Sequence, residues 1–198
     1  NRNTNIGNTN VGNRTNIGSN DGNRIGNVSG NRIGNNTINS GNRIGNTTIG
    51  NGGNGILVSD FSMADIVANR VFGSSANGIA ITDSASCALE SNSCYFNLEL
   101  GIDLGNDDVT MNDPGDTDPG PDGLQNFPVI TSASYDGLLH FTGTLNSAPS
   151  QDYRIEFFVS PTCELSGFGE GYYPAGTVDT TTGLGGDAFF SLDVFPNG

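Results

Sequence analysis

Aspartates gather in one short stretch near the middle of the chain. Residues 103–122 contain no basic residue and seven aspartates: Asp103, Asp107, Asp108, Asp113, Asp116, Asp118 and Asp122. Carboxylates so close together repel one another unless water or cations separate them, and Ca²⁺ takes about six to eight oxygen ligands of this kind. The stretch is not an EF-hand, because the twelve-residue order and the final glutamate of that motif are missing. The sequence predicts either a calcium-binding loop or a solvated linker.

The aspartate stretch lies between two regions of different composition. Eighteen of the first 54 residues are asparagine, whereas from about residue 127 the chain is rich in Phe, Val, Ile and Tyr. Proline and glycine within residues 106–123 disfavour helix and strand. We therefore predict three parts, at residues 1–105, 106–123 and 124–198.

A repeat of 23 residues organises the first part. "NGILV" at residues 54–58 recurs as "NGIAI" at 77–81, and the same step reaches "LGIDL" at 100–104. Short apolar strands at a fixed period are typical of a solenoid, in which each coil packs only on its neighbours. The sequence thus predicts an all-β protein whose first part is a parallel β-helix with 23-residue coils.

Asparagines also recur at this step, in the columns Asn8, Asn31, Asn54, Asn77 and Asn23, Asn46, Asn69, Asn92. Stacked asparagine side chains can hydrogen-bond to the coil above and below, so both columns are expected to form ladders. A disordered low-complexity tract is the alternative for the asparagine-rich part. The first 50 residues follow the 23-residue step less cleanly, which indicates that the coil changes or the register slips there.

The last part reads as strands and turns. Five apolar or alternating segments occupy residues 127–135, 138–145, 153–160, 175–181 and 187–195. They predict a small antiparallel β-sandwich of immunoglobulin type, a fold that usually has about seven strands. The predicted sandwich is therefore a strand or two short.

Cysteines and glycosylation sequons give two further predictions. Three cysteines allow at most one internal disulfide, for which Cys87 and Cys94 are the natural pair, with Cys163 left over. Free buried thiols are the alternative. The N-glycosylation pattern occurs at Asn13, Asn27, Asn35 and Asn46, although such matches arise freely in sequence rich in Asn and Thr.

A longer segment resembles a known family. "LGIDLGNDDVTMNDPGDTDPGPDGLQNFPVITSA", followed by "GTLNSAPSQDYRIEFFVSPTC" and "GFGEG", is similar to segments of large secreted bacterial proteins with right-handed parallel β-helix repeats of the pectate-lyase-like superfamily. The resemblance covers residues 54–195, and "LQNFPVIT" after the Asp-rich stretch is its most specific part. It implies an extracellular or cell-surface protein in which a β-helix precedes β-sandwich modules.

Charge and motifs narrow the class of function. The net charge of −14 argues against a nucleic-acid partner, which requires a basic face. No apolar run is long enough for a membrane span. Many β-helices of this superfamily cleave acidic polysaccharides, and a lyase-like site would place Arg24 and Arg70 on one face near Asp60, Asp65 and Asp83. The sequence contains none of the usual triad or metalloprotease motifs, so we predict no catalytic residues.

A structural role remains the leading hypothesis. Residues 1–54 contain five arginines and one acid, whereas residues 55–198 contain two arginines and twenty acids. The chain reads as repeat from its first residue, which leaves no sequence for a polar cap, and an uncapped coil invites another chain. We therefore expect an extracellular homopolymer, a fibre or adhesin stalk, that associates head to tail with strand donation as one route.

Overall fold

The computed structural model describes residues 53–59, 63–164 and 166–195, together with short strands between Asn5 and Ile49. The chain divides into two compact units. Unit 1 comprises Asn1–Thr110, Gly120–Asp122 and Ser160–Tyr172, and unit 2 comprises Met111–Pro119, Gly123–Val159 and Tyr173–Gly198. Residues 111–119 therefore belong to the second unit, and residues 160–172 return to the first. Within the described residues, no helix is long and apolar enough to cross a membrane.

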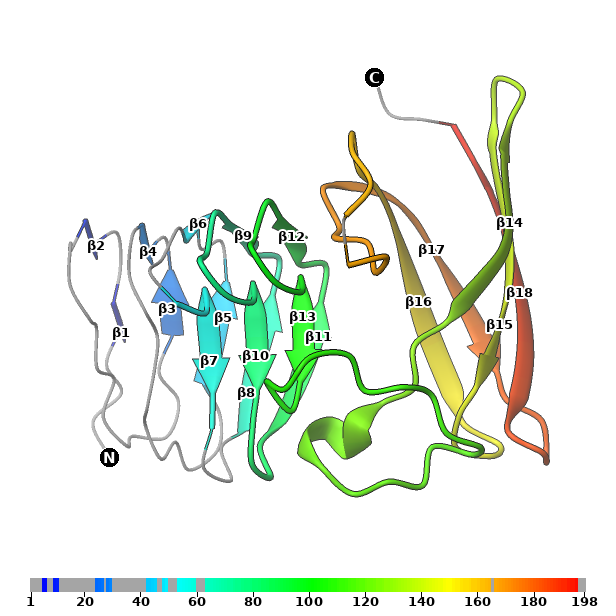
Figure 1. Cartoon of the computed structure of the whole chain (residues 1–198), viewed down its shortest axis with the longest axis horizontal. Coiled ribbons are helices and arrows are strands. Elements are labelled where there is room, and N and C mark those ends of the chain that lie inside the picture. The colour runs from blue at the N-terminus through cyan, green and yellow to red at the C-terminus, as the bar shows by residue number, and fades with distance from the viewer. Residues whose placement is uncertain are drawn as a thin grey trace. The chain divides into compact units, whose positions relative to one another are not determined.

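Unit 1 is a stack of parallel strands (Figure 1). Its largest sheet has the order β1 (Asn5–Ile6), β3 (Arg24–Gly26), β5 (Asn42–Gly45), β8 (Met63–Val67) and β11 (Ser86–Glu90). A second sheet has the order β13 (Ile102–Leu104), β10 (Ile79–Ile81) and β7 (Ile56–Val58). A third has the order β12 (Ser93–Tyr95), β9 (Arg70–Phe72) and β6 (Thr48–Ile49), and β2 (Thr9–Asn10) pairs with β4 (Val28–Ser29).

The predicted 23-residue step is confirmed from residue 54 onward. Ile79 lies beside Ile56 on one side and beside Ile102 on the other. Strand β11 pairs with β8 at the same step, from Ser86 beside Met63 to Glu90 beside Val67. Residues one period apart are thus neighbours on adjacent coils.

The same step is wrong for the first coils. Ile6, Ile25 and Ile44 lie side by side at intervals of 19 residues, and Ile44 lies beside Ile66 at an interval of 22. The coils there contain fewer residues between corresponding strands. The spacing of "GNRIG" at residues 22 and 41 carries this shorter period. The column members Asn8, Asn23, Asn31 and Asn46 lie outside the described residues.

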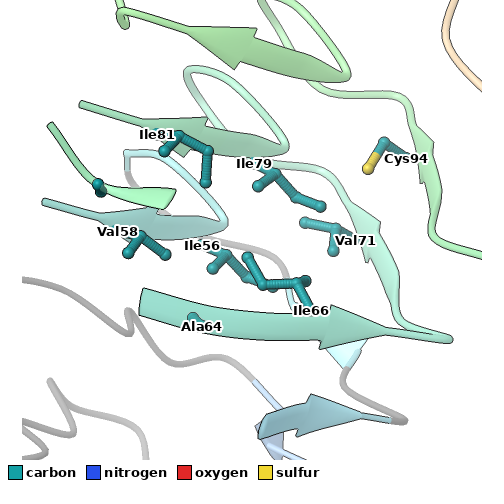
Figure 2. Packing of buried hydrophobic residues seen from close by; sticks show 9 residues of the cluster. Ile56, Val58, Ala64, Ile66, Val71, Ile79, Ile81 and Cys94 are labelled. Carbon is teal, nitrogen blue, oxygen red and sulfur yellow. The ribbon is translucent and has the colours of Figure 1, made fainter. Parts of the chain in front are cut away.

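A thin apolar core runs along the inside of unit 1. Figure 2 shows side chains from several strands directed toward one another, among them Ile56, Ile66, Val71 and Ile79, which are fully buried. The cluster also includes Val58, Ala64, Ile81, Ala85 and Cys94. Few apolar residues per coil are enough, because each coil covers the next.

Buried asparagines form ladders beside this core. The Oδ1 atom of Asn92 accepts hydrogen bonds from the backbone N and Nδ2 of Asn69, at 3.0 and 2.9 Å. In the other predicted column, Asn54 Oδ1 accepts from the backbone N of Asn77 at 3.1 Å. Asn77 Oδ1 accepts in turn from the backbone N of Leu100 at 2.8 Å. Each side chain satisfies a backbone group that the curved coil would otherwise leave unpaired.

A third ladder ends on a segment that the sequence assigned to the sandwich. Asn97 Oδ1 accepts from the backbone N of Ser74 at 3.1 Å, one coil earlier. On its other side Asn97 donates from Nδ2 to Glu170 at 2.7 Å. Tyr172 packs on Tyr95 with ring centroids 4.2 Å apart. Residues 160–172 therefore cover the last coil of unit 1.

The predicted disulfide is not formed, and Cys87, Cys94 and Cys163 are free thiols. Cys87 lies on β11 and Cys94 on β12, which belong to different sheets, and Cys94 is part of the apolar core. Burial raises the pKa of each of these two thiols to about 12. Both are therefore protonated and unreactive at neutral pH.

Unit 2 is an antiparallel sandwich with the five strands that the sequence predicted. One sheet has the order β14 (Val129–Tyr135), β15 (Leu139–Asn146) and β18 (Asp187–Val194), and the other pairs β16 (Asp152–Val159) with β17 (Tyr173–Thr181). The single short helix of the described residues, the 3₁₀ turn η1 (Pro121–Leu124), crosses the boundary between the two units in the sequence. Phe141, Ile155, Phe157 and Phe190 form the core of the sandwich.

The only histidine of the chain links two elements of this sandwich. His140 on β15 contacts Asp193 on β18 through Nδ1 at 2.8 Å and Asp136 in the hairpin turn through Nε2 at 2.9 Å. These hydrogen bonds raise the pKa of His140. A raised pKa in the folded state means that the stabilisation is fully present below the unfolded value of about 6.5 and is lost as the pH rises through the folded value.

Replacing His140 with glutamine is therefore expected to lower the melting temperature at pH 5.5 and to have less effect at pH 8.5. The imidazole is charged at pH 5.5 and loses its proton as the pH rises through its raised pKa, while the lowered pKa of Asp136 keeps that carboxylate ionised. Thermal unfolding followed by circular dichroism at the two pH values measures the difference. An equal loss at both would show that the charge of His140 does not contribute.

Candidate metal centre

The structure separates the seven aspartates of the central stretch. Asp113, Asp116 and Asp118 come together in unit 2, with one carboxylate oxygen from each within 4.8 Å of the others. Asp103, Asp107, Asp108 and Asp122 belong to unit 1. Of the seven aspartates named as candidate ligands, the three in unit 2 form a group that could hold a metal ion.

Asp103 has a structural role instead. Its side chain is only 2 % exposed, and its Oδ2 accepts a hydrogen bond from Asn77 Nδ2 at 2.8 Å. Its Oδ1 accepts from the backbone N of Asn106 at 2.9 Å, which fixes the turn after β13. Burial raises the pKa of this carboxyl group.

Asp122 also serves the fold. Its Oδ1 accepts a hydrogen bond from the backbone N of Cys87 at 2.6 Å, and its own backbone N donates to the carbonyl of Ala85 at 3.2 Å. These two bonds fasten η1 to the last coil of unit 1. Asp107 and Asp108 are exposed, and their backbone N–H groups help to hold Asp103.

The loop that carries the three clustered aspartates is tightly wound. Gly115 and Asp116 have φ values of 79° and 56°, a left-handed conformation that glycine and aspartate tolerate better than most residues. Asn126 holds the loop from inside, since its Nδ2 donates to the carbonyls of Asp113 and Asn146 at 2.7 and 2.8 Å. The carboxylates are thus positioned by the backbone of the loop.

Two of the three carboxylates are partly engaged. Asp113 Oδ2 accepts from the hydroxyl of Thr117 at 2.8 Å. Asp116 Oδ1 accepts from the backbone N of Asn126 at 2.9 Å, and Asp116 Oδ2 accepts from Ser147 Oγ. Ser147 Oγ lies 2.8 Å from the hydroxyl of Tyr153. Ser147 therefore links the Tyr153 side chain to Asp116 of the cluster.

Asp118 differs from the other two. Its Oδ1 atom is buried and has no hydrogen-bond partner. A buried carboxylate oxygen without a donor is costly, and three carboxylates within 4.8 Å add mutual repulsion. A divalent cation with oxygen ligands would relieve both costs.

Neither of the two basic side chains of unit 2 is recorded as an ion-pair partner of the three clustered aspartates. Unit 2 contains nine acids, one arginine and one histidine. Arg154 donates from Nε to Asp179 at 3.1 Å, and His140 lies between Asp136 and Asp193. The described geometry therefore fits a hard cation better than an internal ion pair.

Other residues singled out by the sequence are dispersed. Arg24 lies on β3 and Arg70 on β9, in different sheets, so the face expected of a lyase-like site is not formed by this pair. Asp83 lies in a turn with a φ of 58°. Asp60 and the sequon residues Asn13, Asn27, Asn35 and Asn46 fall outside the described residues.

Sequence reasoning missed two functional elements of unit 1. Asn97 lies 23 residues after Ser74, so its ladder pairs asparagine with serine, and a search for repeated asparagine passes over it. Glu170 lies 73 residues from Asn97, and no local pattern indicates that contact.

The fold and the site define a class: an all-β protein with stacked parallel strands and a buried asparagine ladder, followed by antiparallel sandwich-like sheets and an acidic cluster able to hold a metal. No protein-family model matches the sequence, and no curated protein is similar enough to match it.

Proposed function

We propose that this chain is a non-catalytic extracellular structural protein that self-associates head to tail into a fibre or adhesin stalk. The observation that carries the proposal is the use of the buried polar side chains in unit 1. Asn54, Asn69, Asn77, Asn92 and Asn97 all bond to a neighbouring coil. These side chains hold neighbouring coils together by hydrogen bonds, as expected of a scaffold.

The charge distribution supports the head-to-tail arrangement. Five arginines and one acid lie in residues 1–54, and unit 2 has nine acids against one arginine. Residues 1–54 of one copy attract unit 2 of another, while parts of like charge repel. Such an interface joins different surfaces, and it extends into a filament when the rotation between successive copies does not close a ring.

The acidic cluster supports an extracellular setting and a calcium cofactor. Three aspartates supply part of a calcium shell, and backbone carbonyls and water commonly supply the rest. Extracellular calcium modules have dissociation constants of about 10⁻⁴ to 10⁻³ M. The resemblance to secreted bacterial β-helix proteins, carried by "LQNFPVIT" after the Asp-rich stretch, points to the cell surface or its exterior.

Polysaccharide binding or lyase-like cleavage is the alternative. An aromatic recess in unit 1, lined by Tyr95, Phe96, Thr162, Glu164 and Tyr172, is the feature that favours binding. Phe96 is 55 % exposed there, and an exposed ring is a usual platform for a sugar.

Electron microscopy of the purified chain with Ca²⁺ tests the structural proposal. Regular fibres whose abundance rises with protein concentration are expected. Discrete particles that stay monomeric at high concentration would overturn the proposal. Retention on an acidic-polysaccharide matrix would then favour the alternative.

Terbium luminescence tests the metal centre. Because the Tyr153 hydroxyl reaches Asp116 through Ser147, excitation of Tyr153 should sensitise Tb³⁺ bound at Asp113, Asp116 and Asp118. Ca²⁺ should displace the signal, and Tyr153→Phe should reduce it. If Ca²⁺ displaces Tb³⁺ only at concentrations far above millimolar, the aspartates form a solvated linker and not a calcium site.

Calcium is also expected to stabilise the fold. At a concentration ten to a hundred times Kd, binding adds about 1.4 to 2.7 kcal/mol to the free energy of unfolding. Asp118→Asn should abolish the increase in melting temperature, whereas Asp108→Asn, an exposed aspartate in unit 1, should retain it. Equal responses of the two variants would exclude the proposed site.

A further inference from the structure

Residues 170–172 take the place of a further coil at the end of unit 1. Inside the stack, the backbone N of Ser74 donates to Asn97 Oδ1 on the next coil at 3.1 Å. The equivalent donor one coil later is the backbone N of Asn97, which donates to both carboxylate oxygens of Glu170 at 3.2 Å. Glu170 is 7 % exposed and also accepts from Asn97 Nδ2 at 2.7 Å. Its carboxylate thus ends the ladder where a side chain of a next coil would lie.

The same segment extends a stack of aromatic rings. Phe72 and Tyr95 lie one period apart, and their rings are stacked with centroids 5.2 Å apart and planes inclined by 8°. Tyr172 adds a third ring, with its centroid 4.2 Å from that of Tyr95, and Tyr95 is only 8 % exposed. Glu170 and Tyr172 therefore continue two ladders of unit 1 at once.

The segment runs in the opposite direction to the coils that it covers. In the coils the aromatic residue comes two positions before the ladder residue: Phe72 before Ser74, and Tyr95 before Asn97. In residues 170–172 the carboxylate comes first and the ring follows, although they contact Asn97 and Tyr95 respectively. A further parallel coil needs a neighbouring strand that runs in its own direction. The reversed segment belongs to no described strand and offers none.

A second segment closes the neighbouring strand β11. Asp122 Oδ1 accepts from the backbone N of Cys87 at 2.6 Å, and the backbone N of Asp122 donates to the carbonyl of Ala85 at 3.2 Å. A strand of a next coil would pair with backbone groups of the same two kinds. The end of unit 1 is therefore closed at β11 and beside β12 by sequence that lies outside the repeats.

We infer that residues 170–172 act as a terminating rung, which completes the last coil of unit 1 and keeps a second copy from docking on it. An open strand edge is a template for another chain, and a solenoid needs a capped end to remain soluble. The inference goes beyond the proposed fibre, because it excludes the last coil as a contact surface between copies.

Hydrogen exchange followed by NMR tests the rung at its backbone contact. Glu170→Ala removes the acceptor of the Asn97 amide and should accelerate its exchange about ten- to a hundredfold. The Asn69 amide, which donates to Asn92 inside the stack, should keep its rate. Glu170→Gln retains an accepting oxygen and should accelerate the Asn97 amide less than Glu170→Ala does. If neither variant accelerates Asn97 selectively over Asn69, the inference is wrong.

Sedimentation velocity tests the blocking role. Glu170→Ala combined with Tyr172→Ala should associate at a concentration about tenfold lower than the unaltered chain, because roughly one aromatic side chain, Tyr95, becomes available for burial. Tyr172→Ala alone, which spares the Glu170 contact, should shift association in the same direction. Glu164→Ala, a matched change in a residue outside both ladders, should leave association unaltered.

The outcomes separate this inference from the fibre proposal. If neither Tyr172 variant associates more readily than the unaltered chain, the rung does not block the last coil, and the inference fails while the fibre proposal stands. If the unaltered chain forms no fibres and the Tyr172 variants do associate, the fibre proposal fails and the terminating rung stands.

Discussion

Replacing Asn77 with aspartate will destabilise unit 1 strongly at neutral pH. Asn77 is 2 % exposed, and its Nδ2 lies 2.8 Å from Asp103 Oδ2. The substitution puts two carboxylates at hydrogen-bond distance in a buried place and removes the donor. We expect a loss of about 3 to 5 kcal/mol in the free energy of unfolding at pH 7.5, measured by denaturant unfolding with circular dichroism.

The pH dependence of this variant follows from the same contact. Two buried carboxylates raise the pKa of the pair, so one proton is retained in the folded state. A raised folded-state pKa makes the protein most stable below the unfolded value of about 3.9 and less stable as the pH rises through the folded value. The deficit of Asn77→Asp relative to the unaltered chain should therefore shrink between pH 7.5 and pH 5.

A swap of the two residues provides the control. The double variant Asn77→Asp with Asp103→Asn restores one amide and one carboxylate at the same contact. The amide introduced at position 103 can donate to the new carboxylate at position 77. Its oxygen can still accept from the backbone N of Asn106, as Asp103 does now. Most of the lost stability should return, a coupling that a double-mutant cycle measures. If the double variant loses the sum of the stabilities lost by the two single variants, the contact between residues 77 and 103 does not hold the coils together.

Replacing Gly78 with alanine will also disrupt unit 1. A Cβ at Gly78 would lie 2.5 Å from the carbonyl oxygen of Gly101 and 2.9 Å from Asn97 Nδ2. The first of these is backbone of the next coil and cannot rotate away. We expect the loss to be about 3 kcal/mol or more, at or above the upper end of the usual cost of overpacking, or a failure of unit 1 to fold.

Gly53 is the matched control for this substitution. A Cβ at Gly53 would meet nothing within 4 Å, so Gly53→Ala should change stability by no more than about 0.5 kcal/mol. Denaturant unfolding of both variants separates two effects of a glycine-to-alanine change. Both variants lose the backbone freedom of glycine, but only Gly78→Ala places a Cβ against the next coil. Similar effects at Gly53 and Gly78 would contradict the coil-on-coil contact.

Part of the fold could be predicted because it repeats. The alignment of Ile56, Ile79 and Ile102 follows from a fixed step along the chain, and the parallel register reproduces it. The five sandwich strands were also predicted, since alternating apolar residues and Gly-containing turns mark them locally. In these places local pattern and tertiary structure agree.

The remaining features depend on contacts that no local pattern reports. Residues 160–172 follow a sandwich strand in the chain, yet Glu170 binds Asn97 of unit 1. The aspartates looked like one cluster because they are close in sequence. Separate hydrogen bonds hold Asp103 and Asp122, and only Asp113, Asp116 and Asp118 come together. The first coils were misread because the frequent asparagines match many periods.

Dipolar broadening between two spin labels tests the stacked-coil structure most directly. Met63 and Ser86 are exposed and lie beside each other on β8 and β11, while Cys87 and Cys94 are protected by burial. In a Cys163→Ser chain labelled at Met63→Cys and Ser86→Cys, labels on strands about 5 Å apart should broaden the spectrum strongly. Labels at residues 63 and 90, about 13 Å further along the strand, should broaden it less. If the coils were not stacked, the 23 residues between the labels could span up to about 75 Å as an extended chain, and the spectrum would be sharp. A sharp spectrum from the first pair would therefore contradict the stacked coils and the scaffold role derived from them.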